Sequence, residues 1–385
     1  MFDYLSPLED SFKELISELP NGSIGQSVLF WEADQFEDLE DGDVVLFSIA
    51  ENRLNKKSCG VNLSFDNVRQ EFYQLMKGNW AVRLIDFGVV NVGNELSDTY
   101  FAIRSFTEAL VKKGVVPLVL AGAQDLFYSS YRGFDSFNTG VNVVNIDAKF
   151  DIGSVEQGDE IVRSYVGEMI VNSPFNLFNY TNIGYQSCYV SQQEHDLMHK
   201  LYFDSLRIGE VVGDLSVVEP FFRNADLVSL DLGVIQGELG GNRPNGFNNR
   251  EICALSRYVG ISDKVKFFGI YEYDHSCSSP LGDALLAQIM WYFVEGYSLR
   301  FGEGISVDND NFFHYNVCLS DDLYSFYKSK RTERWWVELP LYLGTSDNKN
   351  TKIMLPCSHK DYLDVTKNKI PERWLNAKKR YQMLM

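Results

Sequence analysis

The sequence lacks the features of secreted, membrane-spanning and nucleic-acid-binding proteins. Its six cysteines are scattered without CxxC spacing, which in 385 residues indicates free thiols in a reducing compartment. No apolar run approaches the roughly 18 residues of a membrane helix. Lys and Arg number 35 against 53 Asp and Glu, and the net charge of −18 would repel a nucleic acid backbone. Met1–Pro20 lacks the basic start and apolar stretch of a secretion signal, so we expect a cytoplasmic protein without membrane insertion.

Between Asp43 and Ser298, short apolar runs alternate with amphipathic stretches. The predicted strands are rich in Val, Ile, Leu and Phe on both faces, as strands covered by helices on two sides require. They are Val44–Ile49, Val82–Phe87, Val115–Leu120, Val141–Asp147, Thr181–Tyr185, Leu227–Leu232 and Val265–Tyr271. The predicted helices are Ser97–Lys113, Ser191–Leu201, Asn248–Tyr258 and Pro280–Ser298. This alternation predicts an α/β fold, a three-layer α/β/α sandwich with a doubly wound, mostly parallel sheet.

The two ends of the chain differ from this central region. Residues 1–42 are acidic and predict a helical N-terminal preface to an α/β domain over residues 43–300. Residues 301–385 predict a small C-terminal extension, a β-hairpin followed by a helix at Pro371–Gln382. From Asp321 onward, 13 basic and 8 acidic residues give +5, whereas the rest carries −23. The charge contrast suggests that the extension packs against an acidic surface, of this chain or a neighbour, but a solvated basic helix is the favoured interpretation, because basic helix ends are common.

Polar clusters follow three of the predicted strands. Gln124 follows the strand Val115–Leu120, and Asp147 ends the strand Val141–Asp147 with Asp151 four residues later. Asp231 lies near the end of the strand Leu227–Leu232, with Gly233 two residues later. Carboxyl ends of parallel strands meet at one edge of a sheet, and converging carboxylates bind hard or borderline cations. Capping of loops at the strand ends is the structural alternative.

The order and spacing of these clusters resemble the ureohydrolase superfamily of arginase, agmatinase and formimidoylglutamase. The family's motifs GGDH or GGGH, DAHxD and DxD correspond here to Ala121–Gln124, Asp147–Asp151 and Asp231–Gly233. Supporting matches over residues 43–300 are Asn182–Gly184, Pro244–Glu251 and Phe268–Glu272. The resemblance implies a hydrolase of amidine or guanidine C–N bonds that uses two manganese ions and forms trimers or hexamers. It does not extend to the C-terminal extension.

The chain departs from this family at half of the metal-ligand positions. Gln124 and Lys149 stand where the family has histidines, and Gly233 stands where it has an aspartate. The remaining, vestigial ligands are Asp147, Asp151 and Asp231. Of the five histidines, the first is His195, so no small shift of the alignment restores an imidazole. An ammonium beside a second metal would repel it, and we therefore expect Lys149 to bridge Asp147 and Asp231 in place of a metal.

Two functional hypotheses follow from these departures, and the missing histidines favour the first. In the first, the protein is a pseudoenzyme without a metal cofactor that binds a protein partner or another copy of itself. In the second, it is an active hydrolase that holds Mn²⁺ through the remaining aspartates and uses Glu251 and Glu272 on a cationic substrate group. Each glutamate has a structural alternative, Glu251 in the first turn of a helix and Glu272 as the partner of an arginine. A third possibility, a subunit of a larger assembly, rests on the trimers and hexamers of the family and on Trp335 and Trp336 as an exposed pair, although such pairs more often belong to a core.

Other patterns carry less information. His195 and His199 have the spacing of a zinc-binding helix, but Asp196 replaces the glutamate that such enzymes require. Gly237–Gly241 is glycine-rich without a phosphate-loop pattern, and we expect a flexible loop at the mouth of the site. Asp125 is interpreted as a helix N-cap.

Overall fold

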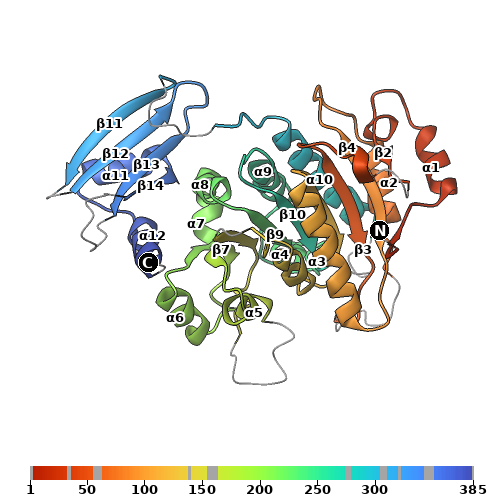
Figure 1. The fold of residues 1–385 in the computed structure, drawn as a ribbon, viewed down its shortest axis with the longest axis horizontal. Helices are drawn as coiled ribbons and strands as arrows, with labels where there is room; N and C mark the ends of the chain where they lie inside the picture. Colours follow the sequence, from red (N-terminus) through yellow and green to blue (C-terminus); the bar gives the residue numbers. More distant parts are fainter. Residues whose placement is uncertain are drawn as a thin grey trace.

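A computed structural model describes residues 3–32, 36–54, 63–137, 140–153, 164–273, 279–303, 310–319, 322–341 and 351–383. The main sheet contains β1 (Leu5–Ser6), β2 (Leu29–Phe30), β3 (Val44–Ile49), β4 (Leu84–Val90), β5 (Val116–Ala121), β6 (Val141–Ile146), β7 (Leu177–Tyr185), β8 (Asp204–Arg207), β9 (Leu227–Asp231) and β10 (Phe267–Tyr271). Its strand order is β1-β4-β3-β5-β10-β9-β6-β7-β8, and β2 also pairs with β4. Pairing is parallel throughout except between β1 and β4, so the predicted mostly parallel sheet is confirmed (Figure 1).

Helices cover both faces of this sheet. They are α1 (Asp10–Ser17), α2 (Asp66–Gln74), α3 (Leu96–Lys112), α4 (Leu126–Arg132), α5 (Tyr165–Val171), α6 (Gln192–Lys200), α7 (Ile208–Gly213), α8 (Glu219–Arg223), α9 (Asn249–Gly260) and α10 (Pro280–Tyr297). Alternate residues of each strand pack on opposite faces, so Leu46 joins a core with α2, α9 and α10, and Phe47 joins one with α3, α4 and α5. The predicted three-layer sandwich is therefore confirmed. None of the helices in the described ranges is long and apolar enough to cross a membrane.

The central strands and the long helices lie close to their predicted positions, but the N-terminal region does not match its prediction. Residues 1–42 were expected to form a helical preface. The described part of this region has one α-helix, α1, while β1 and β2 both join the main sheet through β4. The two strands have two residues each, too short to give an alternating pattern that sequence analysis can detect.

The C-terminal extension is larger than the predicted β-hairpin and helix. Its antiparallel sheet contains β11 (Phe312–Leu319), β12 (Asp322–Ser329), β13 (Trp335–Leu341) and β14 (Thr351–Cys357), in that order, and is followed by α11 (His359–Thr366) and α12 (Glu372–Met383). A single hairpin buries too little apolar surface to be stable, whereas this sheet packs on a fully buried Trp374 from α12. Trp335 and Trp336 are buried, so the prediction of an exposed pair is wrong.

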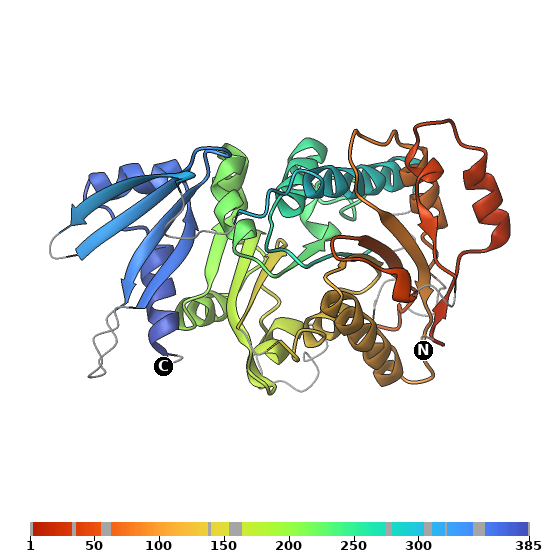
Figure 2. The ribbon, with the colours of Figure 1, turned by 45° about the horizontal axis from the view of Figure 1, so that its top comes forward.

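The extension lies beside α6, α7 and α8, at the opposite end of the molecule from the N-terminus (Figures 1 and 2). Arg223 of α8 donates from Nη1 to the Trp335 carbonyl at 3.0 Å and from Nη2 to the Cys357 carbonyl at 3.1 Å. Its guanidinium also stacks over the Trp336 ring, 4.4 Å from the centroid. This side chain therefore joins the main domain to two strands of the extension.

Ion pairs add to this contact. Arg334 of the extension lies 3.3 Å from Glu219, and Arg380 of α12 lies 3.3 Å from Asp204 at the start of β8. The extension therefore packs against acidic residues of its own chain, and the favoured interpretation of a solvated basic helix is wrong for Arg380 of α12.

We expect Arg223→Ala to lower the free energy of unfolding by about 3 kcal/mol, because it leaves two buried carbonyl groups without their charged donor and removes one of the two arginines that pair with Glu219. Urea denaturation measures this loss, and limited proteolysis tests release of the extension. Arg104→Ala is the matched control, since Arg104 is half exposed and pairs with Asp135 at 3.3 Å. That change should cost under about 1 kcal/mol. Equal losses in the two variants would contradict the role of Arg223.

Candidate metal centre

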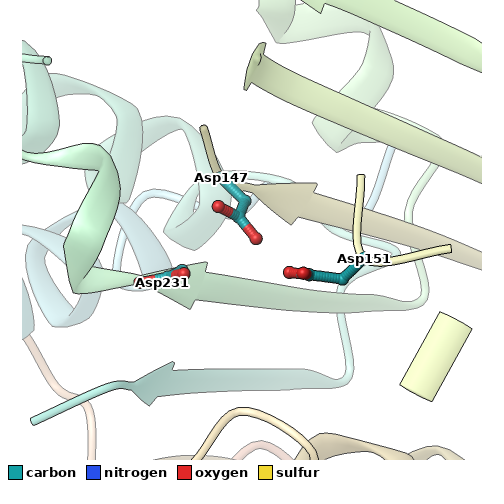
Figure 3. A group of neighbouring side chains, drawn as sticks. All are labelled: Asp147, Asp151 and Asp231. Carbon is teal, nitrogen blue, oxygen red and sulfur yellow. The ribbon is translucent and has the colours of Figure 1, made fainter. Parts of the chain in front are cut away.

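The predicted strand-end aspartates meet at one point of the sheet. β9 lies between β6 and β10, with Ile146 opposite Leu230 and Tyr271 opposite Asp231. Asp147 follows β6 directly, and its carboxylate points toward those of Asp151 and Asp231 (Figure 3). One carboxylate oxygen from each of these three residues lies within 4.8 Å of the others. The group could therefore hold a cation.

Local hydrogen bonds fix two of these carboxylates. Asp147 accepts from the backbone N–H of Lys149 at 3.0 Å and from Asn145 Nδ2 at 3.2 Å. Asp231 accepts from the backbone N–H of Gly233 at 2.5 Å. In both turns an aspartate at the strand end accepts from the residue two positions later, an arrangement that aspartate side chains favour. The capping alternative is therefore also correct for Asp147 and Asp231, without excluding a metal-binding role.

Gln124 supports the site through a chain of hydrogen bonds. Its Nε2 donates to Asn145 Oδ1 at 2.8 Å and to Ser229 Oγ at 3.1 Å. Asn145 in turn donates to Asp147, so the amide of Gln124 positions a carboxylate indirectly. Both amide hydrogens of Gln124 are used in these bonds.

Lys149 does not bridge the aspartates. Its backbone N–H bonds to Asp147, and its carbonyl accepts from Asn182 at 2.6 Å. Among the ion pairs of the described residues, none joins the Lys149 ammonium to Asp147 or Asp231, so the predicted bridge is wrong. The side chain is half-buried, and its charge lowers the pKa of Asp151 only as a minor influence beside burial and the neighbouring aspartates.

Burial makes this cluster costly to ionise. Loss of solvation raises the pKa of Asp231 to about 8 and that of Asp151 to about 6. Asp147 adds to the rise at Asp231, whereas at Asp151 the charge of Asp231 raises the pKa and a hydrogen bond with Asp147 lowers it. The pKa of Asp147 is also well above its ordinary value, first because of burial and then because of Asp151. Ionised carboxylates at this distance repel one another strongly in a buried setting, and a divalent cation would remove that repulsion.

The two candidate catalytic glutamates occupy different surroundings. Glu251 forms a capping box with Asn248 at the start of α9, with bonds of 2.9 and 3.1 Å, so its structural alternative is observed. It also lines a pocket of about 550 Å³ with Arg207 and Gln236, and none of the clustered aspartates lines that pocket. Glu272 accepts a 3.0 Å bond from the backbone N–H of Gln124 and has a left-handed backbone, with φ of 65°. Glu272 therefore lies beside the site, whereas Glu251 is held at a helix end.

Sequence reasoning missed several residues of the site. Asn145 and Ser229 lie inside β6 and β9, where their burial hides them among apolar neighbours. Tyr180 of β7 is buried and accepts from Asn145 at 3.2 Å. Arg243 lies in the loop between β9 and α9, and its charge lowers the pKa of Asp231 against the effect of burial. A polar residue two positions before a strand-end aspartate was the signal available for Asn145 and Ser229.

We expect the metal-free protein to be less stable at pH 8 than at pH 5. A carboxyl group whose pKa is raised by folding adds stability below its unfolded value of about 4, and this stability is lost as the pH rises through the folded value. For Asp151 and Asp231 this stability is lost over the pH range from about 4, the unfolded pKa, to about 8, the folded pKa of Asp231. Urea denaturation in a chelating buffer should show a loss of about 3 kcal/mol between pH 5 and 8.

Asp231→Asn should remove most of this pH dependence. The exposed Asp196→Asn on α6 is the control and should keep it. If Asp231→Asn keeps the full dependence, the cluster is not its source.

Comparisons with known proteins agree with this fold. The model of the arginase family matches residues 43–279. A formimidoylglutamase of Corynebacterium efficiens is 26% identical over 160 residues, which cover 37% of this chain and 51% of that protein. The chain thus matches about half the length of this curated relative.

Solved structures at low identity show the same fold. Formimidoylglutamase of Bacillus subtilis superposes with a TM-score of 0.63 at 14% identity, covering 78% of this chain and 97% of that one. Formiminoglutamase of Trypanosoma cruzi with Mn²⁺ superposes with a TM-score of 0.59 at 16% identity, covering 70% of this chain and 97% of that one. Because the family model spans more than half of the sequence, this chain belongs to the arginase family.

Proposed function

We propose that this arginase-family protein is a pseudoenzyme that has lost the two-manganese site and uses the retained scaffold for binding. The observation that carries this proposal is the donor set. Of the ligand positions that the resemblance identifies, those that keep a carboxylate form a single cluster of three residues, Asp147, Asp151 and Asp231. A two-metal site needs bridging carboxylates and further ligands on each side of them.

The other ligand positions do not supply these further ligands. Gln124 directs its amide hydrogens to Asn145 and Ser229. Gly233 has no side chain, and Lys149 contributes an ammonium whose charge already acts on Asp151. These residues do not fit a second metal ion.

One divalent cation does fit the three aspartates. Carboxylate oxygens suit Mn²⁺ and Mg²⁺, and such an ion would supply a Lewis acid and acidify a bound water. This fit favours a second candidate function, a hydrolase of linear amidine or guanidine C–N bonds with a single metal. In that case Glu272, held by the Gln124 N–H, would face the cationic substrate group, and Glu251 would have to leave its capping box.

The partner of the pseudoenzyme stays a prediction. The candidates are a protein or a second copy of this chain, in the cytoplasm. The basic residues of the extension do not favour an external acidic partner, because Arg334 and Arg380 already pair with Glu219 and Asp204 of the same chain.

Metal content tests the proposal. Protein purified without chelator, incubated with Mn²⁺ and dialysed should hold at most one manganese per chain by plasma mass spectrometry. It should not hydrolyse formimidoylglutamate, arginine or agmatine at a rate above that of Asp231→Asn, the variant that removes one of the carboxylates. One manganese with hydrolysis that this variant abolishes would establish the second candidate function. Two manganese ions per chain would contradict both.

A further inference from the structure

The loop between β9 and α9 has a fixed shape that presents Arg243 to the site. The backbone N–H of Gln236 donates to the Phe247 carbonyl at 3.0 Å, and Phe247 N–H donates to Val234 at 2.9 Å. Further along, Gly237 N–H donates to the Arg243 carbonyl at 3.0 Å. These bonds pair the two sides of the loop, so its glycines lie in a closed turn.

The guanidinium of Arg243 fills the space that a side chain at position 233 would take. A Cβ placed on Gly233 would lie 3.1 Å from Arg243 Nη2 and 2.9 Å from Asp231 Oδ1. Position 233 is one of the lost ligand positions, so a permanent positive charge lies where the resemblance places a metal-binding carboxylate. Arg243 and Asp231 are nevertheless not within ion-pair distance of each other among the described contacts, which leaves the guanidinium free to bind another group.

The unmet hydrogen-bonding capacity of Arg243 indicates what that group is. Its guanidinium packs against the ring of Tyr189, with 5.3 Å between Cζ and the ring centroid. Its Nη1 is buried and has no acceptor among the described residues. A buried guanidinium N–H requires an acceptor, and the fork of an arginine matches the two oxygens of a carboxylate.

We propose that Arg243 is a built-in cation in place of the second metal ion and that it binds the carboxylate group of a small ligand beside the aspartate cluster. The proposal rests on the proposed function, since it requires the second metal to be absent. A divalent ion at Asp147, Asp151 and Asp231 would offset the negative charge that otherwise repels such a ligand. The ligand class is therefore a small carboxylic acid. Arg243 would bind it on one side, and the divalent ion held by the aspartate cluster would lie on the other.

Acetate is the simplest probe. In buffer with Mn²⁺, acetate should raise the Tm of the full chain in a saturable manner, relative to chloride at the same ionic strength. Arg243→Ala should weaken the apparent acetate affinity at least tenfold, and Arg243→Lys should recover it only in part, because lysine keeps the charge but not the fork. Arg250→Ala, at an exposed arginine at the start of α9, is the matched control and should bind acetate like the wild type.

Gly233→Ala tests the geometry without removing the arginine. Its methyl group would press on Nη2 and on Asp231 Oδ1, so acetate affinity should fall severalfold while circular dichroism stays unchanged. Equal acetate binding by wild type and Arg243→Ala, or no saturable effect in the wild type, would overturn the inference. Manganese counted in the same samples keeps the two proposals distinct, since two ions per chain would refute the proposed function itself.

Discussion

Parallel pairing of β9 with β6 and β10 is the constraint on which the site depends. It brings Asp147 and Asp231 to the same edge of the sheet and buries them between two layers of helices. Burial is what raises the pKa values of these carboxyl groups, so the fold creates an electrostatic cost that a cation or a proton must relieve. The hydrogen bonds from Lys149, Gly233 and Asn145 hold the carboxylates in place whether or not a cation is bound.

The sequence predicted the parts of the fold that burial controls. β3 has the predicted bounds Val44–Ile49, since both of its faces are covered and every residue is apolar or small. The short edge strands β1, β2 and β8 were missed because two to four residues carry no usable period. The size of the extension was missed for another reason. Most residues of β11 are exposed, so this strand lacks the alternation of buried and exposed side chains that sequence analysis detects.

The candidate site was predictable where its carboxylates lie at or shortly after the end of a strand, as those of Asp147, Asp151 and Asp231 do. The electrostatics of the site could not be predicted in the same way. Lys149 was expected to bridge the aspartates because it stands at a ligand position of the family motif, but only its backbone bonds to one of them. Arg243 is remote in sequence from all of them except Asp231 and approaches the site only because the loop folds back onto Gly233. The motif position therefore indicated the wrong cation, since it carries no information on how a long loop closes.

The contact between Gly233 and Arg243 also has a consequence for how such a site could change over generations. A carboxylate regained at position 233 would meet the guanidinium before it met a metal, and the two would neutralise each other. Loss of the arginine alone would leave a buried cluster of acids with one less compensating charge. Under the proposed function, neither of these single substitutions would therefore restore a two-metal centre by itself.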